Sequence, residues 1–110
     1  MKIHKIKKDT IKYCTNALQK FWGLRMTKKF GKHKTLLFTI NKGEYPLIDM
    51  FFVFHTIRIA WLDKNYKVLD TTIAKPFRIY APKTKEEIVY FIETTKETKI
   101  EKNDKIKIIT

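Results

Sequence analysis

The sequence predicts an α+β domain in which one N-terminal amphipathic helix packs on a curved, mostly antiparallel sheet of five to six strands, or on a partly closed barrel. Three observations lead to this prediction. Apolar residues recur at helical spacing near the N-terminus, short apolar or alternating runs follow, and neither a repeat nor a low-complexity linker separates them. The 110 residues, 44% of them hydrophobic, suffice for one core, so residues 1–110 are expected to form a single domain.

The helix is predicted from apolar residues that recur every three or four positions between Ile11 and Trp22. The two polar residues before this run can cap it, and Gly23 offers the left-handed conformation that often ends a helix. The start of the helix stays open between Ile11 and Thr15, because isoleucines at positions 3, 6 and 11 also fit a leading strand.

The rest of the chain predicts strands, because its apolar runs are short and bounded by turn residues. Residues 50–61 are the most apolar and are expected to form one long or two abutting strands at the centre of the sheet. Pro76 and Pro82 cannot donate to a ladder, so any pairing of residues 77–80 is expected at an edge. The other predicted strands comprise residues 35–40, 66–71, 88–93 and 105–109.

The expected core follows from the same runs, because large apolar side chains are usually buried. It comprises Met50, Phe51, Phe52, Phe54, Trp61 and Phe91.

The positive charge is concentrated in the first third of the chain. Residues 1–35 hold eleven Lys or Arg against one acid, whereas residues 36–110 hold thirteen against ten, and the net charge is +13. Such a field attracts phosphate backbones without sequence preference. The alternative is that these lysines only form a solvated surface and bind no partner. Residues 1–9 are expected to form a basic arm or a leading strand. The lysines that would carry nonspecific binding of RNA or DNA are Lys2, Lys5, Lys7, Lys8, Lys28, Lys29, Lys32 and Lys34.

The composition excludes several familiar classes of protein. Serine is absent, and the chain has one cysteine and three glycines. A serine nucleophile, a disulfide framework, a zinc site of the CxxC type and a glycine-rich phosphate loop are therefore excluded. No apolar run approaches the roughly 18–20 residues of a membrane helix, and no signal peptide is recognisable. We therefore expect a cytoplasmic protein without a membrane partner or a cofactor.

The order of short motifs resembles that of an uncharacterised family. Residues 23–25 read Gly-Leu-Arg where members have Gly-Leu-Met, and residues 36–38 read Leu-Leu-Phe, as members do. Residues 50–54 and 59–63 fit the methionine-aromatic and hydrophobic-Asp stretches that follow. From residue 14 to residue 109 the chain resembles the family called domain of unknown function 192, or uncharacterised protein family 0127. The resemblance implies a β-rich fold without an established activity.

The centre of the longest motif departs from the family. Thr56, Ile57 and Arg58 stand where members usually have Pro-Ile-Asp, so a cation replaces a carboxylate. The chain therefore lacks the carboxylate that the resemblance implies at position 58.

No constellation of residues predicts a catalytic or metal site. The histidines, His4, His33 and His55, lack the spacing of metal ligands, and Cys14 lies on the apolar stripe as a small hydrophobe. An enzyme would require His55, a carboxylate and an open pocket to converge in space. The acids that could contribute, each also explained as a turn or strand-flanking residue, are Asp49, Asp63, Asp70, Glu93 and Asp104.

The best candidate for a recognition surface is the proline-flanked edge with Phe77, Arg78 and Tyr80. An aromatic ring beside an arginine can stack on a base or anchor a partner, and protection of a sheet edge explains the pattern equally well. The sequence therefore predicts a small basic accessory or binding domain that contacts a protein or a small ligand. Nonspecific nucleic-acid binding is the alternative.

Overall fold

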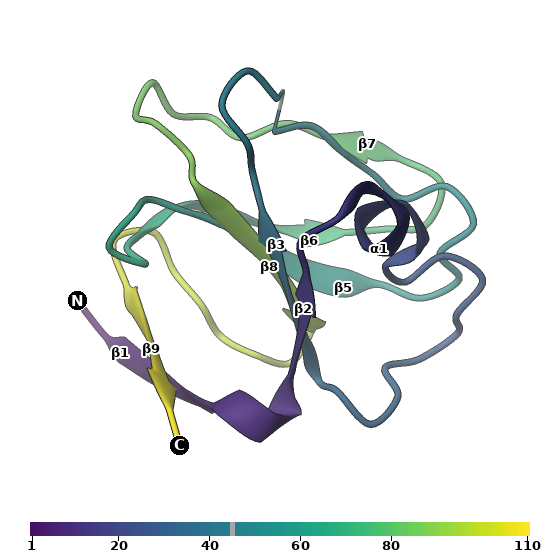
Figure 1. Ribbon diagram of the computed structural model, residues 1–110, viewed down its shortest axis with the longest axis horizontal. Coiled ribbons are helices and arrows are strands. Elements are labelled where there is room, and N and C mark those ends of the chain that lie inside the picture. Colours follow the sequence, from purple (N-terminus) through teal and green to yellow (C-terminus); the bar gives the residue numbers. More distant parts are fainter. Residues whose placement is uncertain (45) are drawn as a thin grey trace.

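The computed structural model describes residues 1–44 and 46–110, and nearly all of its regular elements are strands (Figure 1). The only helices among these residues are a single 3-10 turn and one short α-helix. In chain order the elements are β1 (Ile3–Lys7), η1 (Lys8–Thr10), β2 (Ile11–Cys14), α1 (Ala17–Trp22), β3 (Thr35–Thr39), β4 (Ile48–Asp49), β5 (Ile57–Leu62), β6 (Val68–Ala74), β7 (Ile79–Tyr80), β8 (Tyr90–Thr95) and β9 (Lys105–Ile109).

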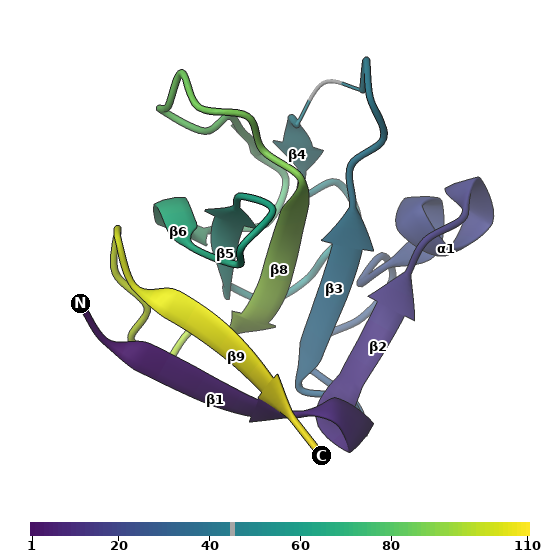
Figure 2. The same cartoon turned by 60° about the vertical axis from the view of Figure 1, so that its left-hand side comes forward.

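The main sheet has five strands in the order β2-β3-β8-β5-β6 (Figure 2). The pair β2–β3 is parallel and the other three pairs are antiparallel. Two small sheets accompany it, the parallel ribbon β1–β9 and the antiparallel pair β4–β7. The sheets stay open, so the expected partly closed barrel does not form.

Both faces of the main sheet are buried, and strand β5 shows why. Its alternating side chains supply Ile59 and Trp61 to one core cluster and Ala60 and Leu62 to the other. The first cluster is covered by loop residues from 24–30 and 48–53. The second includes Ile106 of β9, and Ile6 of β1 and Ile108 of β9 pack against it, so the β1–β9 ribbon covers this face (Figure 2). The architecture therefore has three layers, with the main sheet in the middle.

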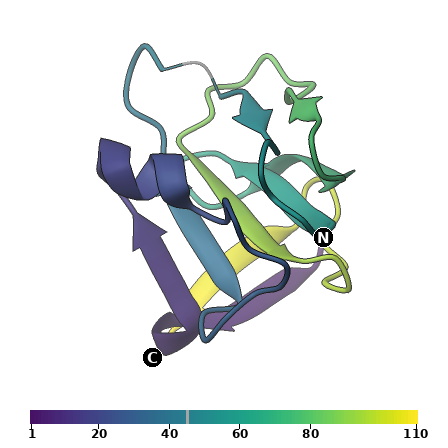
Figure 3. The same cartoon turned by 90° about the vertical axis from the view of Figure 1, so that its right-hand side faces the viewer.

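The predicted N-terminal helix is wrong, and with it the α+β assignment. Residues 11–14 form a strand beside β3, and α1 begins only after Asn16. The Asn16 side chain accepts from the Gln19 backbone while the Gln19 side chain accepts from the Asn16 backbone, which is a capping box. The helix lies at the end of β2 (Figure 3), and Leu18 and Trp22 on its expected apolar stripe are 69% and 50% exposed. The fold is mostly β.

The spacing of Ile11 and Cys14 predicted a helix, although two residues three positions apart can equally lie on opposite faces of a strand. Ile11 packs in the second core cluster and Cys14 in the first, so the two side chains lie on opposite faces of the sheet. The end of the helix is as predicted. Gly23 has a φ of 36°, and its N–H bonds to the Gln19 carbonyl at 3.0 Å.

The most apolar segment divides into a loop and a strand. Strand β5 begins only at Ile57. Residues 50–54 form a loop over the face of the sheet that carries the first core cluster, called the first face below. Met50 and Trp61 are fully buried, as expected. Phe91 is half-buried and packs against the first core cluster. The prediction that the three phenylalanines at positions 51, 52 and 54 lie in the core is wrong, because all three are exposed.

Asp104 stabilises the β1–β9 ribbon at the end where both of its strands begin. Its carboxylate accepts hydrogen bonds from the Lys2 N–H at 3.0 Å, from the Glu101 N–H at 2.9 Å and from His4 Nε2 at 2.8 Å. The hydrogen bond from His4 and those from the two backbone amides lower the pKa of Asp104 to about 2. One carboxylate thus joins the first and last strands.

We predict that Asp104→Ala lowers the thermal midpoint by several degrees at pH 7. The folded pKa lies below the ordinary value of 3.8, so the contribution of Asp104 is complete above pH 4 and is lost as the pH falls through about 2. Thermal unfolding followed by circular dichroism from pH 7 to pH 2 should show the two proteins converging in acid. Asp9→Ala is the control, and an equal loss in both variants would contradict the role of Asp104.

Candidate functional site

Three charged side chains from distant segments meet on the loop-covered face of the sheet. Arg25 follows α1, Asp49 ends β4 and Glu93 lies in β8. The guanidinium of Arg25 donates to both oxygens of Asp49, at 2.7 and 2.8 Å, and to the Phe51 carbonyl at 2.8 Å. This bidentate pair fixes the loop at residues 49–51, since Arg–carboxylate forks are among the stronger polar contacts in proteins. Hydrogen bonding to Arg25 lowers the pKa of Asp49.

Glu93 is buried beneath this pair. Only 6% of its surface is exposed, and it lies opposite Ile59 in the β5–β8 register, so it shares the face of the first core cluster. Burial, with a smaller contribution from the charge of Asp49, raises its pKa to about 8, against the opposing effect of Arg25. At neutral pH the carboxyl group is therefore mostly protonated and can donate a hydrogen bond.

These groups line a recess of about 100 Å³. Its wall includes the rings of Phe38 and Phe91, stacked with centroids 4.4 Å apart, and Trp22 and Leu47 are exposed beside it. Gly23 also lines it, and a Cβ there would lie 3.2 Å from the ring of Phe38. Since a water takes up about 30 Å³, the recess has room for about three waters or for one small polar ligand.

Next to the Arg25–Asp49 pair lies an aromatic surface, defined here as Phe51, Phe52, Phe54 and Phe77. Their side chains are 41–55% exposed. The ring of Phe77 meets those of Phe52 and Phe54 edge to face, with centroids 6.0 and 5.6 Å apart. Exposed aromatic residues that cluster in this way mark interaction sites far more often than scattered ones do.

The backbone under the aromatic surface is strained and tied together. Met26, Phe52 and Phe77 have φ values of 64°, 62° and 60°, which residues with a Cβ rarely adopt. The Met26 N–H donates to the Phe52 carbonyl at 2.5 Å, and the Phe77 N–H to the Met50 carbonyl at 2.8 Å. Such conformations cost about 1–3 kcal/mol each and concentrate at functional sites. Burial of Met50 and Val53, worth about 1.5–3 kcal/mol each, offsets this cost within the same loop.

Of the three residues predicted to form a recognition edge, Phe77 and Arg78 are exposed and Tyr80 is half-buried. Phe77 belongs to the aromatic surface, and Arg78 is exposed beside it while its carbonyl accepts from the Met50 N–H at 2.7 Å. Tyr80 is half-buried against the first core cluster, and its hydroxyl accepts from the Lys75 N–H at 2.7 Å. Tyr80 therefore positions this loop instead of forming part of its outer surface.

The eight lysines of the nucleic-acid alternative fall into two groups. Four precede or lie in β1 and η1, and the others lie in the loop between α1 and β3. From the second group Lys28, Lys29 and Lys34 line one hollow together with Lys96 and His55. We call this site the lysine hollow. Lys32 does not line it.

None of the five acids named from the sequence lines the lysine hollow, which contains His55 and the carboxylate of Glu97. Arg58 lies opposite Thr94, on the other face of the sheet from Glu93, and donates to the Thr98 carbonyl at 3.1 Å. Cys14 is fully buried, and burial raises the pKa of its thiol to about 11. His55 lies in the lysine hollow. Residues 1–44 and 46–110 contain no group of three or more His, Cys, Asp or Glu arranged to hold a metal ion.

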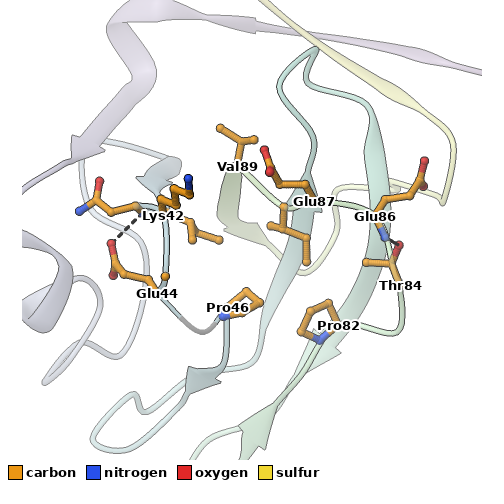
Figure 4. A pocket seen from close by; sticks show the side chains of 12 residues that line it. Lys42, Glu44, Pro46, Pro82, Thr84, Glu86, Glu87 and Val89 are labelled. Atoms are coloured by element: carbon orange, nitrogen blue, oxygen red, sulfur yellow. Dashed lines mark hydrogen bonds between the residues drawn. The ribbon is translucent and has the colours of Figure 1, made fainter.

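A larger hollow of about 550 Å³ lies between residues 40–44 and Pro46 on one side and residues 82–89 on the other (Figure 4). Pro46 and Pro82 line it, and the carboxylate of Glu44 is held by Lys20 at 2.9 Å. All its carboxylates are exposed, so nothing in it resembles the buried carboxyl group of Glu93. Within the described chain, no helix has the length and hydrophobicity needed to cross a bilayer.

Sequence reasoning missed the meeting of Arg25, Asp49 and Glu93. A signal for Glu93 was present, because it interrupts an apolar run and follows Phe91 by two positions, which places both on one strand face. Nothing in the sequence connects that carboxylate with residues 25 and 49, which lie more than forty positions before it.

We predict that Glu93→Gln removes a pH dependence from folding stability. The folded pKa of about 8 lies above the ordinary 4.5, so the wild-type protein loses stability as the pH rises from about 4.5 through 8. At about 1.4 kcal/mol per pKa unit, the variant should gain a few kcal/mol over the wild type between pH 5 and pH 9. Urea unfolding across this range measures it.

The exposed Glu87→Gln is the matched control and should follow the wild type. If Glu93→Gln also follows the wild type, the carboxyl group is not held protonated in the folded chain.

Comparison with known proteins places the chain in a family. The model of DUF192, described as "Uncharacterized ACR", matches residues 1–108. Similar curated proteins include a UPF0127 protein of Thermococcus kodakarensis, 30% identical over 66% of this chain and 46% of its own length. Another, from Pyrococcus horikoshii, is 41% identical over 57% of this chain and 56% of its own. The chain thus spans about half the length of these curated relatives.

Two solved structures share the fold. One is a protein of unknown function from Novosphingobium aromaticivorans, with a TM-score of 0.66, 13% identity, and coverage of 77% of this chain and 61% of that one. The other is a putative transcription regulator from Sinorhizobium meliloti, with a TM-score of 0.65, 14% identity, and coverage of 77% and 67%. At these identities the likeness concerns the fold alone. The family match confirms the resemblance found in the sequence: the chain belongs to the DUF192 family, whose function is uncharacterised.

Proposed function

We propose that this chain is a single binding domain whose aromatic surface docks an apolar, acidic segment of a partner protein, without a catalytic step of its own. The observation that carries the proposal is the exposure of four phenylalanines on loops that are held in strained conformations. A chain selected only for folding would bury these rings or replace them with polar residues. We place the activity in the cytoplasm, where the lone buried cysteine, Cys14, stays reduced.

The rigidity of the surface favours recognition. The loops around residues 26, 52 and 77 are joined by backbone hydrogen bonds and by the Arg25–Asp49 pair, so the rings are held before a partner arrives. Preorganisation of this kind reduces the entropy lost on binding. Aromatic side chains supply large contact areas with few rotatable bonds, which is why they dominate binding hot spots.

The charges beside the aromatic surface determine the kind of partner. Lys75 and Arg78 flank Phe77 in the chain and are exposed, and Lys28 follows Thr27, whose carbonyl accepts from the Phe54 N–H. Asp49, the acid next to Phe51, is already neutralised by Arg25. A segment with carboxylates around its apolar anchors complements this arrangement, and the net charge of +13 would speed its approach.

A display library of random 15-residue peptides, selected on the purified chain, tests this proposal. We expect enrichment of peptides that combine acidic with aromatic or aliphatic residues. Phe52→Gly and Phe77→Gly should each weaken binding by about tenfold or more, as measured by fluorescence anisotropy. Both variants should keep their thermal stability, because glycine relieves the positive φ at these positions.

Two controls separate binding from folding. Asn103→Gly makes the same backbone change at a positive φ outside the aromatic surface, and Leu18→Ser removes an exposed apolar side chain from α1. Both should bind like the wild type. Enrichment of basic peptides, or an equal loss in all four variants, would refute docking at the aromatic surface.

Nonspecific binding of nucleic acid is the second candidate and has less support. The eight lysines divide between the β1 region and the loop before β3, and only three of them share a hollow. Binding through phosphate contacts would weaken steeply and linearly in a plot of log affinity against log salt, whereas docking on the aromatic surface would respond little. Absence of micromolar binding to single-stranded RNA or DNA at low salt would eliminate this candidate.

A further inference from the structure

The lysine hollow gathers positive charge from three separate segments of the chain. Lys28, Lys29 and Lys34 come from the loop before β3, His55 from the turn before β5, and Lys96 from the turn after β8. The hollow has a volume of about 360 Å³, within the range of small-molecule sites and too small for a folded macromolecule. Residues distant in sequence therefore bring four lysines to the lining of one hollow.

The charge of the hollow is unbalanced. Its lining has one acid, Glu97, against the four lysines. None of these lysines forms an ion pair with a residue that the structure describes, because the ion pairs there join His4 to Asp104, Lys20 to Glu44 and Arg25 to Asp49. Like charges held close together repel, so this arrangement is most favourable when an anion is present.

His55 gives the hollow a fixed wall. The Thr27 hydroxyl donates its one hydrogen to the Leu24 carbonyl, so it must accept from His55 Nε2, 3.1 Å away. The ring of Phe30 meets His55 edge to face at 5.3 Å. Burial lowers the pKa of His55, so the neutral ring adds a fixed surface and little charge at neutral pH. The hydroxyl-bearing Thr56 and Thr95 complete a polar lining.

We propose that the lysine hollow binds the phosphate group of a small phosphorylated molecule, at a site that none of the four phenylalanines of the aromatic surface lines. Lysines act as strong point charges toward phosphate and need no forked geometry, which suits a site built without arginine. Four cations against one acid leave enough positive charge to match a dianion. The proposal does not depend on the peptide-docking function.

A titration of the intact chain with inorganic pyrophosphate, followed by ¹⁵N–¹H NMR, tests it. We expect saturable shifts centred on residues 28–34, 55–56 and 95–97. The triple variant Lys29→Gln, Lys34→Gln and Lys96→Gln should bind at least about tenfold more weakly. Glu97→Gln should bind more tightly, because it removes the acid from the lining. Loss of a merely structural contact would not produce this opposite sign.

The control is a triple variant with the same change in charge on the first strand and η1, Lys5→Gln, Lys7→Gln and Lys8→Gln. It should bind pyrophosphate like the wild type. A parallel titration with single-stranded RNA of 6 to 24 nucleotides, read by anisotropy, distinguishes a phosphate site from diffuse attraction. Absence of saturation by pyrophosphate, equal losses in both triple variants, or affinity found only for the longer RNAs would overturn the proposal.

Discussion

Burial of the main sheet on both faces is the constraint on which the rest of the structure depends. The inner strand β5 sends apolar side chains to both faces, so neither face tolerates water. A fold with one six-residue helix cannot cover such a sheet with helices. The β1–β9 ribbon covers one face and irregular loops cover the other, and the loops must then supply apolar residues of their own.

The covering loops explain why the candidate site lies on the first face. Met50 and Val53 must point inward to complete the core, and in a tight turn their neighbours Phe51, Phe52 and Phe54 are forced outward. The same requirement buries Glu93 under the loop, where the Arg25–Asp49 pair covers it. Core packing, the positive φ of Phe52 and the raised pKa of Glu93 therefore occur in one place, because residues 50–54 contribute side chains to both the core and the surface.

Much of the strand content could be predicted from the sequence, and the layout of the site could not. Strand β9 has the predicted bounds and β3 ends one residue early, because short alternating runs between turn residues determine strands locally. The prediction of a helix is wrong at Ile11 and Cys14. Their spacing fits a helix as well as a strand, and only the pairing of β2 with β3 decides between the two. Phe52 was misplaced because no local pattern distinguishes a buried phenylalanine from one that a left-handed turn points into solvent. Charge composition located the basic third of the chain, and only the fold could bring Lys96 to the lysine hollow.

The parallel ribbon also has a consequence for the order of folding. Its two strands are separated by about a hundred residues in the chain, as the contact between Lys2 and Asp104 shows. Loop closure over such a distance is slow, and during synthesis on the ribosome β9 emerges long after β1. The second face of the main sheet, including Leu37 and Ile92, therefore stays bare in the nascent chain until residues 105–109 arrive. In that interval the nascent chain is open to self-association, and a chaperone would protect it there.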